Sequence, residues 1–218
     1  MTSSGVEIIP VTTEEQRRAF ARFPWRVYRD NPNWVPPIFG DRLKLLDPKG
    51  HPFWEHAEQQ LFLARRGQEI VGTISAHINH RHNEVYQDKV GFFGFFEVFQ
   101  DQAAAEALLD TAADWLRERG MEAIRGPENP SQNEEVGLLI DSYDSPPVIL
   151  MTYNPPYYLD FVEGAGFDKA QDLYAWILPT DIFDKDVQRL PRKFLRVAEQ
   201  ARSRENVVIR RIDMKRFD

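Results

Sequence analysis

The sequence has no cysteine among its 218 residues. This absence excludes disulfide bonds and thiolate chemistry, and it fits a reducing compartment. No apolar run approaches the roughly 18 residues that a membrane-spanning helix requires. The opening stretch MTSSGVEIIPVTTEE lacks the basic and apolar regions of a signal peptide. We therefore expect a cytoplasmic protein with no membrane partner.

Positive charge is also scarce. The chain carries 27 Lys and Arg residues against 34 Asp and Glu residues, for a formal net charge of -7. Such a balance gives no support to a nucleic-acid partner. Apolar residues, by contrast, make up 42% of the chain and aromatic residues 12%. This is enough for a complete hydrophobic core in one large domain, or in one domain plus a fragment.

The hydrophobic pattern predicts strands and helices that alternate along the chain. The expected strands are 6–11, 60–67, 69–79, 90–99, 123–127, 148–154, 172–178 and 207–212. The expected helices are 14–28, 39–46, 101–119, 134–140, 155–167 and 186–204. The strands 60–67 and 69–79 are expected to form a hairpin about a tight turn at Gly67-Gln68. The order of the elements predicts an α/β fold in which a mixed sheet carries helices on both faces.

The most apolar of these strands runs directly into a helix. Five phenylalanines fall within residues 92–99, which indicates a central strand that is buried on both faces. A strand–helix junction of this kind is a common place to hold a phosphate, because the first N–H groups of the helix are free. Here the junction contains Gln100, Asp101, Gln102 and Ala103, with neither glycine nor a basic residue. We expect Asp101 to cap the helix itself.

The chain resembles the GNAT (Gcn5-related N-acetyltransferase) superfamily. The resemblance rests on the strand–helix order, on Glu97 near the end of the central strand, and on Asn154, Tyr158 and Gly166-Phe167 around the later helix. A closer resemblance is to an uncharacterised bacterial family with two GNAT-like halves. It is carried by FPWRVYRDNPNWVPP, HPFWEHAEQQLFLARR, GFFGFFE, GPENPSQNEEVGLLIDSYDSPP and YNPPYY, and it covers residues 6–178.

The resemblance implies a GNAT-like domain with a mostly antiparallel sheet, and it places this chain as the N-terminal half of a tandem protein. We expect that domain at residues 1–180, a connector helix at 181–206 and an orphan strand at 207–218. The stretch VVIRRIDMKRFD is similar to VEIIPVTTEEQ near the start of the chain. The orphan strand is therefore either the start of a second GNAT-like domain or a docked C-terminal strand.

The resemblance also implies acyl-CoA chemistry. GNAT enzymes typically hold the CoA diphosphate on an Arg/Gln-x-x-Gly-x-Gly/Ala loop, and residues 100–103 lack that pattern. A carboxylate about 4 Å from a phosphate costs roughly 4 kcal/mol at an effective dielectric constant of about 20. We therefore expect no strong cofactor binding by this chain, with acetyl-CoA or another acyl-CoA bound in a full-length protein.

Candidate site residues fall in two places. Glu97 stands where many GNAT enzymes place a general base; the alternative is a carboxylate paired with an arginine. The second place is a polar stretch near the expected carboxyl ends of strands, where ligands collect. Its residues predict a pocket for an amine, although they could instead cap turns; they are Asn133, Glu134, Glu135, Tyr153, Asn154 and Tyr157.

Two other features are expected to be absent. The tyrosine general acid of many GNAT enzymes would fall at Val162, which cannot donate a proton. His77, His80 and His82 lack a nearby acid that would complete a ligand set, so we expect no metal.

We infer a GNAT-like domain of an N-acyltransferase that is degenerate in CoA binding. It would shape a pocket for a small amine-bearing substrate beside a second GNAT-like half or a homodimeric partner. A self-sufficient acyl-CoA-dependent N-acyltransferase and a structural or protein-interaction module remain as alternatives.

Overall fold

The computed structural model describes residues 5–177, 192–203, 210–211 and 213–214. The chain divides into two compact units, Met1–Gln171 and Asp172–Asp218. The first unit contains the sheet and the candidate site, whereas the described part of the second contains one helix.

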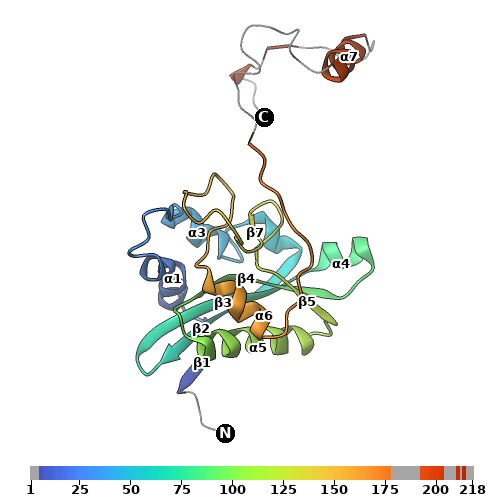
Figure 1. Ribbon diagram of the computed structural model, residues 1–218. Coiled ribbons are helices and arrows are strands. Elements are labelled where there is room, and N and C mark those ends of the chain that lie inside the picture. The colour runs from blue at the N-terminus through green and yellow to red at the C-terminus, as the bar shows by residue number, and fades with distance from the viewer. Residues whose placement is uncertain (1–4, 178–191, 204–209, 212, 215–218) are drawn as a thin grey trace. The chain divides into compact units, whose positions relative to one another are not determined.

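The first unit is built on one five-stranded sheet (Figure 1). Its strands are β1 (Val6–Pro10), β2 (Ala57–Arg66), β3 (Glu69–Asn79), β4 (Val90–Val98) and β5 (Ala123–Arg125). They lie in sequence order, with β1 to β4 antiparallel and β5 parallel to β4. The predicted mixed, mostly antiparallel sheet is confirmed, as is the tight hairpin that joins β2 to β3.

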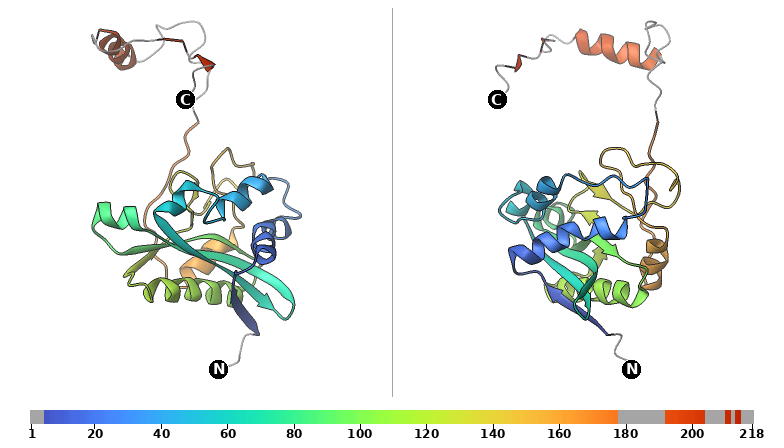
Figure 2. Two further views of the ribbon diagram at one scale, coloured as in Figure 1. Left: turned by 180° about the vertical axis from the view of Figure 1, so that it is seen from behind. Right: turned by 90° about the vertical axis from the view of Figure 1, so that its left-hand side faces the viewer.

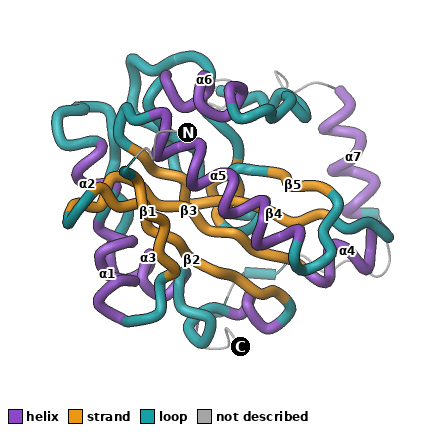
Figure 3. The backbone as a smooth tube through the Cα atoms, turned by 90° about the horizontal axis from the view of Figure 1, so that it is seen from below, coloured by secondary structure: helices purple, strands orange, loops and turns teal. Residues whose placement is uncertain are grey.

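Helices cover both faces of the sheet, as predicted. One face packs against α5 (Gln102–Arg117) and α6 (Tyr157–Gly164). The other face packs against α1 (Glu14–Arg22) and α3 (Phe39–Leu45). Figure 2 shows these two layers on opposite sides of the strands, and Figure 3 shows α5 running across them.

The side-chain period of two along β3 separates the two faces chemically. Ile74, Ala76 and Ile78 belong to the core beneath α5 and α6. The alternate residues Thr73 and Ser75, together with His77, are also buried but point to the other side. The α1–α3 face therefore contains polar groups that the α5 face does not.

An irregularity in β4 positions the candidate site. The pairing of β3 with β4 shifts register between Thr73 and Ser75, and Phe95 of β4 has a φ of +46°. β5 pairs with β4 only as far as Phe92. The chain then crosses β4 so closely that a Cβ atom on Gly94 would lie 1.8 Å from the Glu128 carbonyl oxygen. Only glycine fits at this crossing.

Several predicted elements have different structures. The expected helix 14–28 is two helices, because Pro24 begins α2 (Pro24–Val27) after Phe23. The expected helix 134–140 is replaced by a small hairpin of β6 (Glu128–Asn129) and β7 (Glu135–Val136). Residues 148–154 form a turn and loop rather than a strand, and 172–177 form no strand. Apolar character alone cannot make a strand without a partner edge.

Three remaining helices complete the described elements. The short 3-10 helix η1 (Pro52–Glu55) precedes β2, and α4 (His80–Tyr86) follows β3 with the Asn79 side chain as its cap. In the second unit, α7 (Arg192–Arg202) covers the described part of the helix expected at 186–204. The connector and the orphan strand expected at 207–218 lie largely outside the described residues, so the proposed repeat stays a prediction.

Candidate functional site

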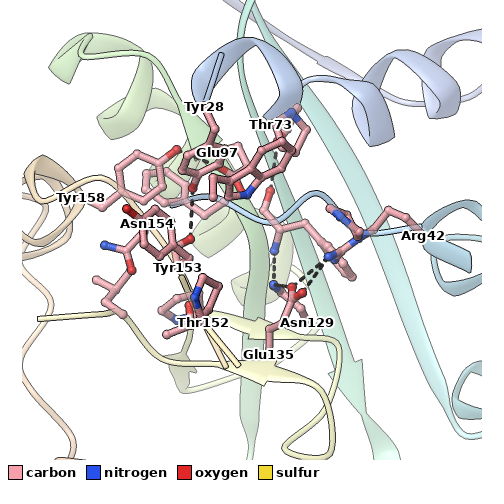
Figure 4. A pocket seen from close by; sticks show the side chains of 18 of the residues that line it. Tyr28, Arg42, Thr73, Glu97, Asn129, Glu135, Thr152, Tyr153, Asn154 and Tyr158 are labelled. Carbon is pink, nitrogen blue, oxygen red and sulfur yellow. Dashed lines mark hydrogen bonds and ion pairs between the residues drawn. The ribbon is translucent and has the colours of Figure 1, made fainter. Parts of the chain in front are cut away.

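A pocket lies on the α1–α3 side of the sheet, beside the irregular part of β4 (Figure 4). Its cavity volume is about 90 Å³. Four of the predicted site residues line it, namely Glu97, Glu135, Tyr153 and Asn154. Other wall residues come from α1, α2, α3, β3, β4 and α6 and from the segments 28–37 and 127–152.

Glu97 provides the titratable carboxyl group of this pocket. It keeps part of its surface accessible, but protein surrounds its carboxyl group, and the resulting desolvation raises its pKa to about 7. The hydroxyls of Tyr158 and Tyr28 oppose this rise. The Tyr158 hydroxyl donates to Glu97 Oε2 at 2.8 Å and accepts the Val98 N–H at 2.7 Å, which fixes the carboxyl orientation.

The second pocket carboxylate is already neutralised. Both Glu135 oxygens accept from Arg42 Nη2, at 3.0 and 2.9 Å, and Asn129 Nδ2 donates to Glu135 Oε2 at 3.1 Å. The Arg42 guanidinium also lies 5.2 Å from the centre of the Phe95 ring. Within the described residues no salt bridge reaches Glu97. The pocket therefore has one carboxyl group free to accept a proton and one held by a cation.

The polar groups of Tyr153 and Asn154 form hydrogen bonds within the pocket wall. The Asn154 side chain accepts from Leu139 N at 2.6 Å and donates to the Leu139 carbonyl oxygen at 3.3 Å. The Tyr153 hydroxyl donates to Asn31 Oδ1 at 3.1 Å and contacts the Tyr143 carbonyl oxygen at 3.2 Å. These bonds hold two distant loops together around the pocket. They agree with the alternative that such residues stabilise turns and loops instead of binding an amine.

Asn133, Glu134 and Tyr157 do not join this pocket, contrary to the prediction of one cleft. The first two border a separate groove near His51 and η1. Glu134 is held there by the Ser131 hydroxyl across a turn. Tyr157 points to the α5 side, where its hydroxyl donates to the Val98 carbonyl oxygen at 3.0 Å. Successive side chains on a helix point about 100° apart, so Tyr157 and the residue after it face different sides. Its neighbour Tyr158 lines the pocket instead.

The junction at the start of α5 is occupied by the chain itself. Asp101 Oδ1 accepts from Ala104 N at 3.2 Å, so the predicted helix cap is confirmed. Asp101 Oδ2 lies 2.7 Å from Arg66 Nη2. The sequence near the junction contains no basic residue, but the fold brings Arg66 there from β2. That cation forms an ion pair with Asp101.

Beyond the point where the pairing with β5 ends, two backbone N–H groups of β4 also donate hydrogen bonds to side chains of this same chain. Phe95 N donates to Asn129 Oδ1 at 2.5 Å, and Val98 N donates to the Tyr158 hydroxyl. A ligand that extended along this part of β4 would have to displace both side chains, since a backbone N–H has one strong bond to give.

The three histidines lie in different environments. His80 and His82 are on α4, where His80 Nε2 lies 3.8 Å from Glu58 and His82 Nε2 lies 3.4 Å from Asp88. His77 is fully buried between aromatic rings, and this desolvation lowers its pKa to about 3. Across the residues that the structure describes, no group of three or more His, Asp or Glu side chains is arranged to hold a metal ion.

Reasoning from sequence did not identify five residues that shape the pocket. Tyr28, Arg42 and Thr73 come from segments that carry no polar motif, and Asn129 and Tyr158 each lie within five residues of a predicted site residue. A helical-wheel comparison of Tyr157 with Tyr158 could have placed the second toward the sheet. Nothing in the sequence around Arg42 indicates its partner, since Glu135 is far away along the chain.

Comparisons with known proteins agree with this architecture. The family model described as "Acetyltransferase (GNAT) family" matches residues 20–133. The "Bacterial ceramide synthase" of Caulobacter vibrioides is 39% identical over 219 residues, which is 100% of this chain and 55% of that protein. "Protein YghO" of Escherichia coli K12 is 35% identical over 202 residues, which is 92% of this chain and 49% of that protein. The chain thus spans about half the length of these relatives.

Solved structures match this chain at low sequence identity. An aminoglycoside acetyltransferase from an uncultured soil metagenomic sample, in complex with sisomicin, is 14% identical with a TM-score of 0.48. The match covers 82% of this chain and 99% of that one. Because the family model matches more than half of the chain, including β2, β3, β4 and α5, this chain belongs to the acetyltransferase (GNAT) family.

Proposed function

We propose that this domain binds the amine-bearing substrate of an N-acyltransferase and that Glu97 takes a proton from the substrate ammonium group. The observation that carries the proposal is a carboxyl group with a pKa of about 7, held by Tyr158 in a pocket beside β4. A base with a pKa near neutral can both accept and release a proton at physiological pH. Loss of one proton leaves the neutral amine, which is the form that can form an amide.

The Arg42–Glu135 pair contributes to this assignment. Because Arg42 already binds Glu135, the ammonium group meets Glu97 as its available carboxylate in the pocket. Within this pair Arg42 lowers the pKa of Glu97 and Glu135 raises it, so the cation offsets the repulsion from the second carboxylate. Tyr158 acts as a positioning residue, since its hydroxyl donates to Glu97 Oε2, and the Tyr28 hydroxyl also lies against this carboxyl group.

We further propose that acyl-CoA is held mainly by a second GNAT-like domain, or by a partner copy. Two features support weak CoA binding here. The Asp101 carboxylate occupies the start of α5 with its Arg66 partner. Asn129 and Tyr158 occupy the N–H groups of β4 next to the pocket. Relatives about twice as long as this chain have room for the second domain.

The named relative suggests the chemistry of the acceptor. Ceramide is an amide formed on the amino group of a long-chain base, so a ceramide synthase acylates an amine. We propose the same class of acceptor for the protein to which this domain belongs.

Calorimetric titration of the 218-residue chain with acetyl-CoA and with long-chain acyl-CoAs tests the cofactor part. We expect no binding in the micromolar range by the natural chain. A variant with Asp101→Gly and Gln102→Arg, which removes the carboxylate and adds a cation, should gain measurable affinity. Micromolar binding by the natural chain would instead support a self-sufficient acyltransferase.

Titration with a short-chain 2-amino-1,3-diol tests the amine part. Affinity should rise as the pH increases through about 7, where Glu97 ionises, and should fall again as the amine loses its proton. Glu97→Gln should abolish the lower limb of this profile, whereas Glu134→Gln, in the separate groove, should leave it unchanged. Equal affinity in the natural chain and the Glu97→Gln variant would favour a structural or interaction module.

A further inference from the structure

Exposed aliphatic side chains are concentrated around the mouth of the Glu97 pocket. Among the described residues of the first unit, nine large hydrophobic side chains are exposed, and seven of them fall in two short segments, 35–38 and 140–151. Ile149 is the extreme case at 90% exposure. We call these seven residues the apolar rim: Val35, Ile38, Ile140, Val148, Ile149, Leu150 and Met151.

The two segments of the rim are joined to each other and to the pocket. Val35 and Met151 line the pocket themselves, as do Pro37 and Pro147 beside the other rim residues. Asn33 Nδ2 donates to the Tyr143 carbonyl oxygen at 3.0 Å, which ties the segments together close to the rim. The pocket wall at Thr152 and Tyr153 follows directly after the rim along the chain (Figure 4). The rim therefore adjoins the pocket at Val35 and Met151 rather than lying on a distant surface.

The rim has little capacity for specific polar contacts. Neither VPPI at 35–38 nor PPVILM at 146–151 contains a charged or hydrogen-bonding side chain. Protein–protein interfaces instead centre on Trp, Tyr and Arg, with Leu and Val under-represented, and carry about one hydrogen bond per 100–200 Å². Exposed apolar patches mark protein, membrane or ligand interaction sites, and the lack of hydrogen-bonding side chains in these two stretches favours a membrane.

The small size of the pocket also indicates that most of a long ligand would lie outside it, across the rim. A cavity of about 90 Å³ is small beside the roughly 300–1,000 Å³ of pockets that enclose a whole small ligand. It can take the reacting end of a long molecule, but the remainder must lie outside, across the rim.

We propose that the apolar rim inserts into the surface of a lipid bilayer, so that the Glu97 pocket opens toward the membrane. Binding strength at such an interface scales with the apolar area that is buried. Within the described residues no helix is long and apolar enough to cross a bilayer, so the contact is with one leaflet only. This surface contact departs from the expectation of no membrane partner, which considered only spanning segments and signal peptides.

Charge near the rim sets the lipid preference. Residues 126–168 contain no Lys, Arg or His, while Asp141 and Asp144 lie within the 140–151 segment of the rim. Insertion is therefore hydrophobic, and anionic headgroups should weaken it rather than strengthen it. The proposal concerns a surface and holds whether or not Glu97 accepts a proton from an amine.

Flotation of the chain with phosphatidylcholine vesicles tests the proposal. We expect the natural chain to float with the vesicles, and we expect Val148→Asp/Ile149→Asp to reduce the bound fraction at least tenfold. The matched control is Val85→Asp/Tyr86→Asp on α4, where both side chains are as exposed, at 67% and 68%, but do not line the pocket. This control should bind as the natural chain does, and circular dichroism of all variants checks the fold.

Three results would overturn the proposal. The first is a natural chain that stays with the soluble fraction, in which case a protein such as a second GNAT-like domain covers the rim. The second is equal loss in the α4 control. The third is binding that increases with anionic lipid and disappears in high salt, which would assign the contact to the basic residues of α7.

A probe at the rim gives an independent measurement. Because the chain has no cysteine, Ile149→Cys and Val85→Cys can each carry one environment-sensitive fluorophore. Vesicles should shift the emission of the first to shorter wavelength and leave that of the second unchanged. Unchanged emission at position 149 would refute insertion even if the chain floats.

Discussion

The two faces of the sheet differ in what their side chains do. On the α5 face, aliphatic and aromatic residues from three strands and two helices form one core with exposures at or below 8%. On the α1–α3 face, a smaller apolar cluster is interrupted by Thr73, Ser75, His77 and the Glu97 pocket. One face supplies most of the hydrophobic stabilisation, while the other accepts buried polar groups that cost stability.

β4 connects the two faces. Phe93 and Phe96 enter the α5 core, whereas Phe95 belongs to the opposite cluster. The irregularity between them changes which side each residue faces, and it brings Glu97 onto the side of Thr73. The placement of Glu97 on the face opposite the α5 core therefore depends on one local departure from regular strand geometry.

Truncation in the α5 core should have the largest effect. Leu108 is fully buried beneath the sheet, so Leu108→Ala should lower the free energy of unfolding by about 3 kcal/mol through lost burial and a residual cavity. Urea denaturation measures this change. Val85→Ala, at an exposed position of α4, should change the free energy by less than about 0.5 kcal/mol. Similar losses in both variants would mean that the α5 core is not the main source of stability.

Glu97 should destabilise the pocket face at alkaline pH. Its pKa is raised from 4.5 to about 7 in the folded chain, so its favourable contribution is complete below pH 4.5 and is lost as the pH rises through 7. Glu97→Gln should therefore unfold with a free energy about 2 to 3 kcal/mol higher than the natural chain at pH 8, with little difference at pH 4.5.

Glu135→Gln is the control for this pH effect. It leaves Arg42 without its carboxylate, so it should lower stability at both pH values. If Glu97→Gln gave no gain at pH 8, desolvation of its carboxyl group would not be the dominant influence on the pocket face.

His77 should have the opposite pH dependence. Its pKa falls from 6.5 to about 3 in the folded chain, so its contribution is present above pH 6.5 and is lost as the pH decreases. At pH 5 this residue should have lowered the free energy of unfolding of the natural chain by about 2 kcal/mol relative to its value above pH 6.5. His77→Leu should remove that loss, as measured by urea denaturation at pH 7.5 and 5. His80→Gln, at an exposed position, should leave the acid sensitivity in place.

The start of α5 should show the smallest effect. Asp101→Ala removes the helix cap and should cost about 1 kcal/mol, measured by thermal unfolding. Asp101→Asn keeps an oxygen for the Ala104 N–H and should cost less, because an exposed pair such as Asp101–Arg66 contributes little. An equal cost for Asn and for Ala would show that the ion pair, and not the cap, closes this junction.

Patterns that are local in the chain were predicted well. The β2–β3 hairpin, the strand β4 and the helix α5 follow from alternation, helical spacing and turn residues, and Asp101 was expected to cap α5. The strands expected at 148–154 and 172–178 were not found in the described residues, because a strand also requires an edge to pair with. The apolar loop at 148–151 remained exposed as a result.

The sequence by itself determined the mixed sheet, the apolar core of α5 and the Asp101 cap of that helix, since each depends on residues close together in the chain. Only the tertiary structure decided which carboxylate is paired and which is not. Arg42 reaches Glu135 rather than Glu97, Arg66 reaches Asp101, and Tyr158 rather than Tyr157 enters the pocket. These outcomes depend on contacts between residues 35 to 93 positions apart, and on desolvation, which no local pattern encodes.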